Sequence, residues 1–310
     1  MAAVTAALVK QLREATGSGM MDCKKALGAT DGDIDKAVEW LRENGLMKAA
    51  KRNEKIAAEG VSFAKTSDDA KSGVIVEVNS ETDFVAKNEK FQGFVADVAN
   101  QAMNTTAADV DAFLEEKWAK NPSQTVKDVL TEQIAVIGEN MHIRRFAKLT
   151  ENDGFVETYI HGGGRIAVAL AVKSTVVNDA VKEAAKNVCM QIAAMNPEYL
   201  NDAEVPQEYR DHEMDVLKAQ VANDPEMAKK PENIVEKMLI GRLNKELKEI
   251  CLVDQVYVKD SSMSVQKYID SVAKENGAEI SLVKFVRYET GEGIEKKQED
   301  FAAEVAAQIK

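Results

Sequence analysis

Few side chains in this sequence have the types and spacing that covalent chemistry requires. Residues 161–165 are glycine-rich and could cradle a phosphate, but a strand-like run follows them and no Gly-Lys-Ser/Thr is present. Glu77 and Asp83 are candidates for an acid/base pair, yet the side-chain alternation of a strand does not make them converge. The three histidines lack the spacing of metal ligands. We therefore expect no enzyme, with no catalytic residues, no cofactor and no metal.

Length and composition exclude several classes of protein. The 310 residues suffice for two or more domains, and a hydrophobic content of 45% is that of a globular chain. A net charge of −12 argues against a direct nucleic-acid partner. Three widely spaced cysteines fit a reducing compartment. Without a signal peptide or an apolar run of about 20 residues, a cytoplasmic protein with no membrane association is expected.

Residues 74–88 are the most informative stretch of the chain. An apolar, β-branched run at 74–78 predicts a buried strand. Thr82 or Asp83 is suited to cap a following helix, which would place Phe84 in an exposed first turn beside a carboxylate. Such an aromatic tip on a rigid strand suits an interaction site. The alternative, in which Phe84 folds back under the strand, fits the spacing equally well.

Residues 1–56 predict three short helices. A glycine-rich connection at 17–19 separates the first helix from the second, at 20–27. Asp33 is the expected cap of the third helix, and Asn44-Gly45 is its expected end. A basic helical linker at 48–55 follows. The apolar faces of the first and third helices are Val4, Leu8 and Leu12, and Ile34, Val38 and Leu41.

From about residue 60 the apolar period changes to two. Runs at 61–64 and 74–78 flank a polar turn and predict a β-hairpin. Further strands are expected at 142–149, 154–160, 165–172, 256–258 and 280–288. Helices are expected at 91–103, 110–118, 126–137, 181–195 and 264–275. Strand followed by helix thus occurs twice, a weak internal echo of two related αβ subdomains.

Two further helical segments are expected, one inserted before residue 250 and one at the end of the sequence. Residues 196–249 predict an antiparallel hairpin that protrudes from the main body, with two ordinary core helices as the alternative. Its narrow apolar seam consists of Met214, Leu217, Val221, Leu239, Leu243 and Leu247. The final segment predicts a helix with Phe301, Val305 and Ile309 at four-residue spacing. That stripe either packs on the body or docks on a partner.

The expected fold class is α+β. Its parts are an N-terminal three-helix module at 1–56, a two-subdomain αβ core with small antiparallel sheets, an inserted antiparallel helical hairpin at 196–249, and a C-terminal docking helix at 292–310. The first core subdomain spans 57–150. The second combines 151–195 with 250–291.

Two stretches of this sequence resemble the two signature motifs of the translation elongation factor Ts family. Residues 13–27 resemble the first motif and residues 74–88 the second, and the similarity continues through 137–140, 161–166 and 291–296. The resemblance implies an N-terminal module similar to the ubiquitin-associated fold and self-association through the helical hairpin. It also implies a guanine-nucleotide exchange factor that binds the GDP form of elongation factor Tu. Exchange would displace Mg²⁺, perturb the nucleotide site, release GDP and load GTP.

The resemblance also assigns site residues. An exchange tip of Thr82, Asp83, Phe84 and Val85 is implied, with Phe84 as a wedge. The implied partner-binding residues are Arg13, Met20, Met21, Lys24, His161, Phe301 and Val305. We expect at least one of the two methionines to belong to the core of the small module. The rival interpretation is a non-catalytic scaffold whose binding would survive loss of Asp83 and Phe84.

Overall fold

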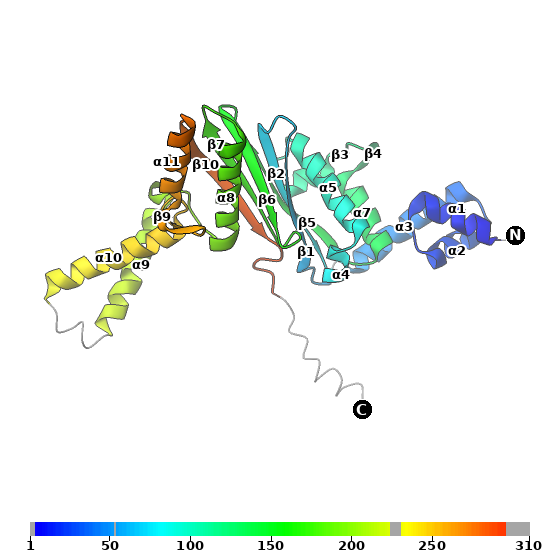
Figure 1. Ribbon diagram of the computed structural model, residues 1–310. Coiled ribbons are helices and arrows are strands. Elements are labelled where there is room, and N and C mark those ends of the chain that lie inside the picture. The colour runs from blue at the N-terminus through cyan, green and yellow to red at the C-terminus, as the bar shows by residue number, and fades with distance from the viewer. Residues whose placement is uncertain (1–3, 53, 224–230, 296–310) are drawn as a thin grey trace.

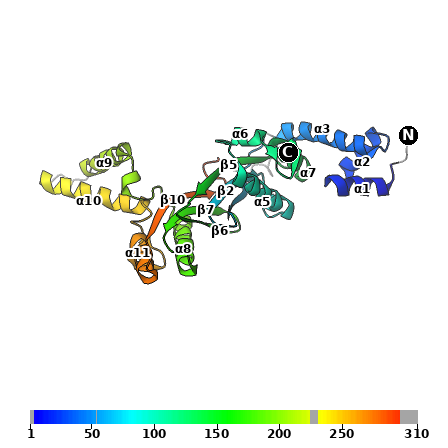
Figure 2. The ribbon, with the colours of Figure 1, turned by 90° about the horizontal axis from the view of Figure 1, so that it is seen from above.

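The centre of the molecule consists of two antiparallel sheets that pack face to face, each covered by helices on its outer side (Figure 1). This computed structural model describes residues 4–52, 54–223 and 231–295. The α+β class with small antiparallel sheets is confirmed. Figure 2 shows the N-terminal helices and the helical hairpin at opposite ends of this core.

The first sheet has the strand order β1-β2-β5. Its strands are β1 (Glu59–Thr66), β2 (Ser72–Ser80) and β5 (Met141–Thr150). Val74, Val76 and Val78 of β2 face α5 (Glu89–Asn104) and α7 (Val126–Ile137), whereas Ile75 faces the other sheet. Because both faces of β2 are covered, its residues 74–76 form a continuous apolar run rather than an alternating pattern.

The second sheet has the strand order β10-β7-β6. Its strands are β6 (Gly154–His161), β7 (Ile166–Ser174) and β10 (Ile280–Glu289). Val168, Leu170 and Val172 of β7 face α8 (Asp179–Met195), and the alanines between them pack against the first sheet. Small side chains on the inner face allow the two sheets to approach closely.

The two sheets belong to repeated units with the same order of elements. In each unit a long hairpin leads to a helix, then to a short two-stranded hairpin, a second helix and a final strand. The short hairpins are β3 (Lys117–Trp118) with β4 (Asn121–Thr125), and β8 (Val256–Tyr257) with β9 (Asp260–Ser264), which precedes α11 (Val265–Asn276). Gly60 and Gly154 are equivalent, because a Cβ on either would lie within 2.2 Å of a neighbouring strand's carbonyl oxygen. The weak echo in the sequence is therefore a repeat of structure.

The N-terminal module comprises α1 (Ala6–Thr16), α2 (Met20–Ala29) and α3 (Ile34–Arg52). The prediction that the third helix ends at Asn44-Gly45 is wrong, since α3 continues to Arg52. Gly45 is buried, and a Cβ there would lie 2.9 Å from the Cβ of Ala135, so this glycine allows α3 to pack closely on α7. Val38 is 38% exposed and borders the cleft towards α7, so it does not share the core face.

The inserted hairpin comprises α9 (Gln207–Ala222) and α10 (Glu232–Ile250), which follow the short 3₁₀ turn η1 (Asp202–Glu204). The predicted leucines of both helices, with partly buried Met214 and Val221, form the seam between them. The hairpin extends away from the sheets (Figure 1), as the narrow seam predicted. Its connecting residues 224–230 and the predicted C-terminal stripe at Phe301, Val305 and Ile309 lie outside the described residues.

One predicted helix, at 110–118, is too long. Helix α6 (Val110–Glu115) ends earlier, and Trp118 belongs to β3. The reason is the side chain of Gln101 on α5, whose Nε2 donates to the carbonyl of Lys117 at 3.1 Å and whose Oε1 accepts from the amide of Ala119 at 2.9 Å. These hydrogen bonds stabilise an extended backbone at residues 117–119, so the helix cannot continue through them.

Candidate partner-binding surface

The tip consists of residues 82–85 at the end of β2, where the chain forms the short helix α4 (Asp83–Ala86). Thr82 is its N-cap, with extended backbone angles and a hydroxyl that accepts from the amide of Val85 at 3.4 Å. Of the two candidate caps, the structure therefore selects Thr82. This leaves Asp83 and Phe84 in the first turn of the helix.

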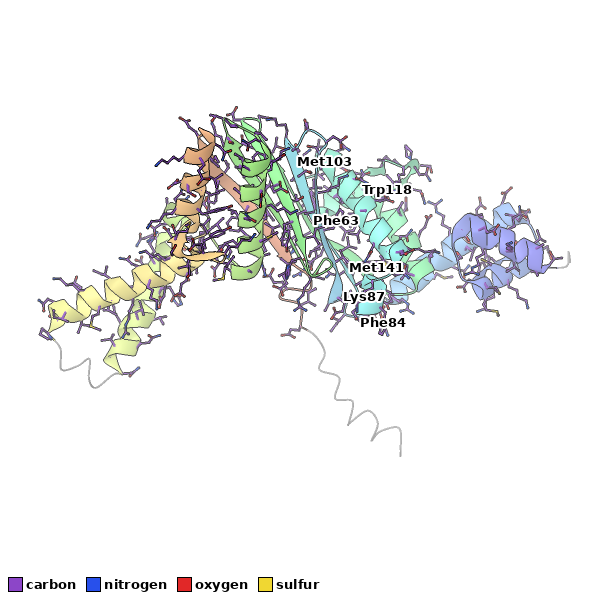
Figure 3. The ribbon with its side chains drawn as sticks, viewed as in Figure 1. Phe63, Phe84, Lys87, Met103, Trp118 and Met141 are labelled. Carbon is purple, nitrogen blue, oxygen red and sulfur yellow. The ribbon has the colours of Figure 1, made fainter. Side chains whose placement is uncertain are left out.

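Phe84 is 81% exposed and lies at the lower edge of the central core (Figure 3). The alternative in which it folds back under the strand is wrong. Val85 is only partly exposed and packs on the first hydrophobic core, so it anchors the helix that presents Phe84. The cost of leaving an aromatic ring in water makes this arrangement typical of a contact residue.

Asp83 is exposed beside Phe84 and pairs with Lys87 one turn later, at 2.7 Å. The hydrogen bond from the Lys87 ammonium holds the pKa of the Asp83 carboxyl below its usual value. The carboxylate is therefore ionised at neutral pH. It is separate from Glu77, which is buried on β2, so the two do not form an acid/base pair.

A latch of two acidic residues, Glu139 and Glu81, fixes the base of the tip. The Glu139 carboxylate accepts from the Thr82 amide at 3.0 Å and from the Thr82 hydroxyl at 2.6 Å. Glu81 in turn accepts from the amide of Asn140 and pairs with Arg52 at 3.1 Å. The connection after α7 and the end of α3 thus both hold the tip. The sequence offered no signal for these contacts beyond the family resemblance of residues 137–140.

His161 ends β6 and is exposed, with its Nδ1 3.0 Å from the hydroxyl of Tyr159. The following turn needs glycine, since residues 162–164 all have positive φ and a Cβ on Gly164 would lie 2.7 Å from Val61. The carbonyl of Gly164 accepts from the amide of Ser62 on β1 at 2.7 Å. Helix α4 also contacts β1, so the tip and the His161 turn are supported by the same strand.

The N-terminal module has a groove of about 670 Å³ between α1 and α2. It brings together four predicted residues, Arg13, Met20, Met21 and Lys24. Both methionines are exposed, at 59% and 62%, so the expectation that one of them is core is wrong. The inward face of α2 begins one turn later, and its small and apolar residues Cys23, Ala26 and Leu27 fill the core of the module.

Comparison with known proteins identifies the family. A sequence model described as "Elongation factor TS" matches residues 81–292, which include the tip, the latch and the His161 turn. Elongation factor Ts of Clostridium perfringens strain SM101 is 51% identical over 303 residues, 98% of each chain. The chain belongs to the elongation factor Ts family. Elongation factor Ts of Clostridium tetani strain Massachusetts is 50% identical over 306 residues, 99% of each chain, and that of Clostridium novyi strain NT is 49% identical over 306 residues.

The structure describes residues 4–52, 54–223 and 231–295 of the chain. Within these ranges, no group of three or more His, Cys, Asp or Glu side chains is placed to hold a metal ion. None of the helices in these ranges combines the length and apolarity that crossing a bilayer demands. The tip, the His161 turn and the α1–α2 groove each expose apolar or charged side chains, among them Phe84, Met20 and Met21.

Proposed function

We propose that the chain is a guanine-nucleotide exchange factor that binds elongation factor Tu in its GDP form and promotes GDP release and GTP loading. The observation that carries the proposal is Phe84, an exposed aromatic side chain on a one-turn helix that is latched at its base. A rigid wedge can act on a partner's nucleotide site because little of its binding energy is spent on ordering it. Such a factor would work in the cytoplasm.

The physical basis of exchange is linkage between two ligands of the same GTPase. A protein that binds the nucleotide-free state more tightly must weaken nucleotide binding by the same factor. Each tenfold loss of affinity needs about 1.4 kcal/mol of differential contact energy. An acceleration of several thousandfold would therefore need roughly 5 kcal/mol, which two or three well-buried contacts can supply.

The predicted contact residues have separate parts in this proposal. Phe84 inserts between helices of the GTPase, and the ionised Asp83 disturbs the region that holds Mg²⁺ against the phosphates. His161 adds a second contact beside the tip. The groove residues Arg13, Met20, Met21 and Lys24 dock the partner at the far end of the molecule, with the segment that carries Phe301 and Val305 as a further docking element.

The test is stopped-flow release of a fluorescent GDP from elongation factor Tu, with the parent chain and with Phe84→Ala. We expect strong acceleration by the parent and loss of most of it in the variant. Val177→Ala is the matched control, since Val177 is an exposed apolar residue, at 45%, in the equivalent connection of the second unit. No acceleration by the parent would reject exchange activity. Binding that survives loss of both Asp83 and Phe84 would favour the scaffold interpretation.

Self-association is a second proposal, carried by the protruding hairpin. Besides its seam, the hairpin leaves Val216, Ile234 and Ile240 exposed at 37%, 41% and 46%. We propose that these side chains are covered in a homo-oligomer. Sedimentation of the parent and of Ile240→Asp across a range of concentrations tests this, and a parent that stays monomeric at every concentration would reject it.

A further inference from the structure

Among the residues that the structure describes, Glu77 is the one charged residue that is fully buried, with 0% exposure. Three donors point at its Oε1: the amide of Gly291 at 2.8 Å, Arg144 at 3.0 Å and Asn79 at 3.0 Å. Its Oε2 accepts from Nε of Arg145 at 2.6 Å. A buried carboxylate with four donors is fully satisfied, but its desolvation is costly, and an apolar residue of similar volume often serves stability as well.

A β-bulge brings both arginines to the same carboxylate. Glu77 is opposite Arg145 on β5, and the next pair is Val78 with Ile143, so Arg144 is the extra residue of the bulge. Consecutive residues of a regular strand point to opposite faces, whereas a bulge lets two neighbours reach the same side. Arg145 continues the network to the carboxylate of Glu292 at 3.0 Å.

The second unit contains the same bulge without the charge. There Val172 is opposite Leu282 and Ala171 is opposite Lys284, which leaves Val283 as the extra residue. Ala171, the equivalent of Glu77, is 2% exposed and packs between the two sheets. The fold therefore forms this bulge and this sheet interface with an alanine. The charged network at Glu77 must serve something other than the strand pairing itself.

The hydrogen bonds of Glu77 connect β2, the strand that precedes the tip, to the glycine turn that follows His161. Glu77 holds Gly291, and the neighbouring hydroxyl of Thr290 donates to the carbonyl of Gly164 at 2.9 Å. The same hydroxyl lies 2.9 Å from that of Ser62 on β1. Gly291 is confined, because its φ is +75° and a Cβ there would lie 2.1 Å from the carbonyl oxygen of Ala58. Little freedom remains anywhere along this path.

We propose that Glu77 is a positioning residue for nucleotide exchange, which fixes the strand that bears Phe84 relative to the turn that bears His161. The inference rests on the proposed exchange function. Two contact groups act together on one nucleotide site only when their separation is fixed, and small misplacements are costly in rate. Glu77 itself does not touch the partner.

The first test separates the rate of exchange from docking. For Glu77→Gln we expect the maximal rate of GDP release to fall about tenfold or more, with the half-saturating concentration of the factor changed less than about twofold. Docking at the α1–α2 groove is untouched by the change. Lys284→Gln is the matched control in the bulge of the second unit, and it should leave both quantities unchanged. A raised half-saturating concentration with an unchanged maximal rate would overturn the proposal.

The second test asks whether Glu77 acts through the His161 turn. With His161→Ala already present, Glu77→Gln should reduce the maximal rate far less than it does in the parent, because the contact that it positions is gone. Fully additive losses would mean that Glu77 only supports the fold, and would overturn the proposal.

A third measurement does not depend on the partner. In the free protein, Glu77→Gln and the gentler Thr290→Val should each raise amide hydrogen exchange at Ser62 and at residues 289–291, while the helices of the second unit stay protected. This result would stand even if the chain failed to accelerate GDP release, so failure of the proposed function and failure of the positioning role are distinguishable. Unchanged exchange at these amides in both variants would overturn the role of the network.

Discussion

The connection from β2 to α5 and the connection from β7 to α8 occupy equivalent places in the two repeated units, yet they differ in length and in chemistry. Both begin with a buried serine whose hydroxyl donates to a carbonyl two residues on, Ser80 to Thr82 and Ser174 to Val176. Both end with an asparagine that caps the following helix, Asn88 or Asn178. Residues 81–87 separate the serine from the cap in the first unit, but only 175–177 do so in the second.

The comparison teaches that α4 and Phe84 are an addition to a unit that folds without them. The short connection shows what the fold needs, and the four residues of α4 account for the difference in length. An added helix that exposes an aromatic ring in its first turn, and that Glu139 holds at its base, adds no buried side chain to the core, so we infer that it serves the proposed contact rather than folding. The helical hairpin of the second unit is an addition of the same kind, since it stands between α8 and β8 where the first unit has only the short α6.

The largest effect is expected when the connection from β2 to α5 is replaced by the shorter connection from β7 to α8. Residues 81–87 can be replaced with Thr-Val-Val, the sequence of 175–177. This variant should no longer accelerate GDP release from elongation factor Tu, while it still folds cooperatively. Loss of the Thr82 hydrogen bonds and of Val85 packing should lower the free energy of unfolding by about 2–4 kcal/mol. Stopped-flow release and urea denaturation measure the two effects. An unfolded variant would show that the tip is part of the fold.

A smaller effect is expected when the tip keeps its sequence but loses its latch. Glu139→Ala removes both acceptors of Thr82, so α4 should fray and the rate of GDP release should fall about tenfold. Its matched control is Glu115→Ala, which removes a surface glutamate paired with Lys127 at 3.4 Å. If Glu139→Ala exchanges GDP as fast as the parent, the latch does not support the wedge.

Where the two units are alike, substitutions should have equal effects. Gln191 holds the short hairpin of the second unit as Gln101 holds that of the first, donating to the carbonyl of Val256 at 3.1 Å and accepting from the amide of Val258 at 2.8 Å. Each glutamine changed to alanine should lower the free energy of unfolding by about 2–3 kcal/mol, because buried backbone groups lose their partners. Urea denaturation checks this, and a clear inequality would show that the repeat is not equivalent in energy.

The smallest expected effect is a difference in acid stability. Burial alone would raise the pKa of Glu77, but hydrogen bonds from Gly291, Asn79 and Arg144 and the charge of Arg145 hold it below its usual value. A lowered pKa stabilises the fold at neutral pH, and this contribution is lost as the pH falls from the usual glutamate range through the folded pKa. The gap in unfolding free energy between the parent and Glu77→Gln should therefore shrink on acidification. A gap that stays constant would contradict the lowered pKa.

Local features of the site could be predicted from the sequence, whereas contacts between distant residues could not. The strand at 74–78 and the cap at Thr82 follow from apolar patterning and side-chain chemistry within a few residues. The hydrogen bond from Thr82 to Glu139 joins residues 57 apart in the sequence. The bulge that turns Arg144 towards Glu77 depends on the pairing of β2 with β5, which are also distant in the sequence. The end of α3 could not be predicted from Gly45, because a glycine that ends a helix and one that lets a neighbouring helix approach look the same in sequence.

The repeat was only a faint echo in the sequence because its two copies share geometry more than residue types. Trp118 and Tyr257 occupy equivalent places in the short hairpins, and Phe91 and Val181 do so in the first turn of α5 and α8. Packing needs an apolar side chain at these positions but not a particular one. The predicted division of the chain into domains stays a prediction.

Because α3 is one continuous helix, it fixes the position of the N-terminal module relative to the tip. Its 19 residues form one uninterrupted rod of roughly 28 Å, packed on α7 at Gly45, so the α1–α2 groove and the tip stand at a set distance and a set angle. One residue inserted in α3 between Leu41, which packs in the module core, and Gly45 would turn the groove by about 100° around the helix axis. Four would bring it back to within about 40° of its original direction and move it about 6 Å outward. Under the proposed function, the length of this helix therefore fixes the spacing that the two contact sites of a partner must match.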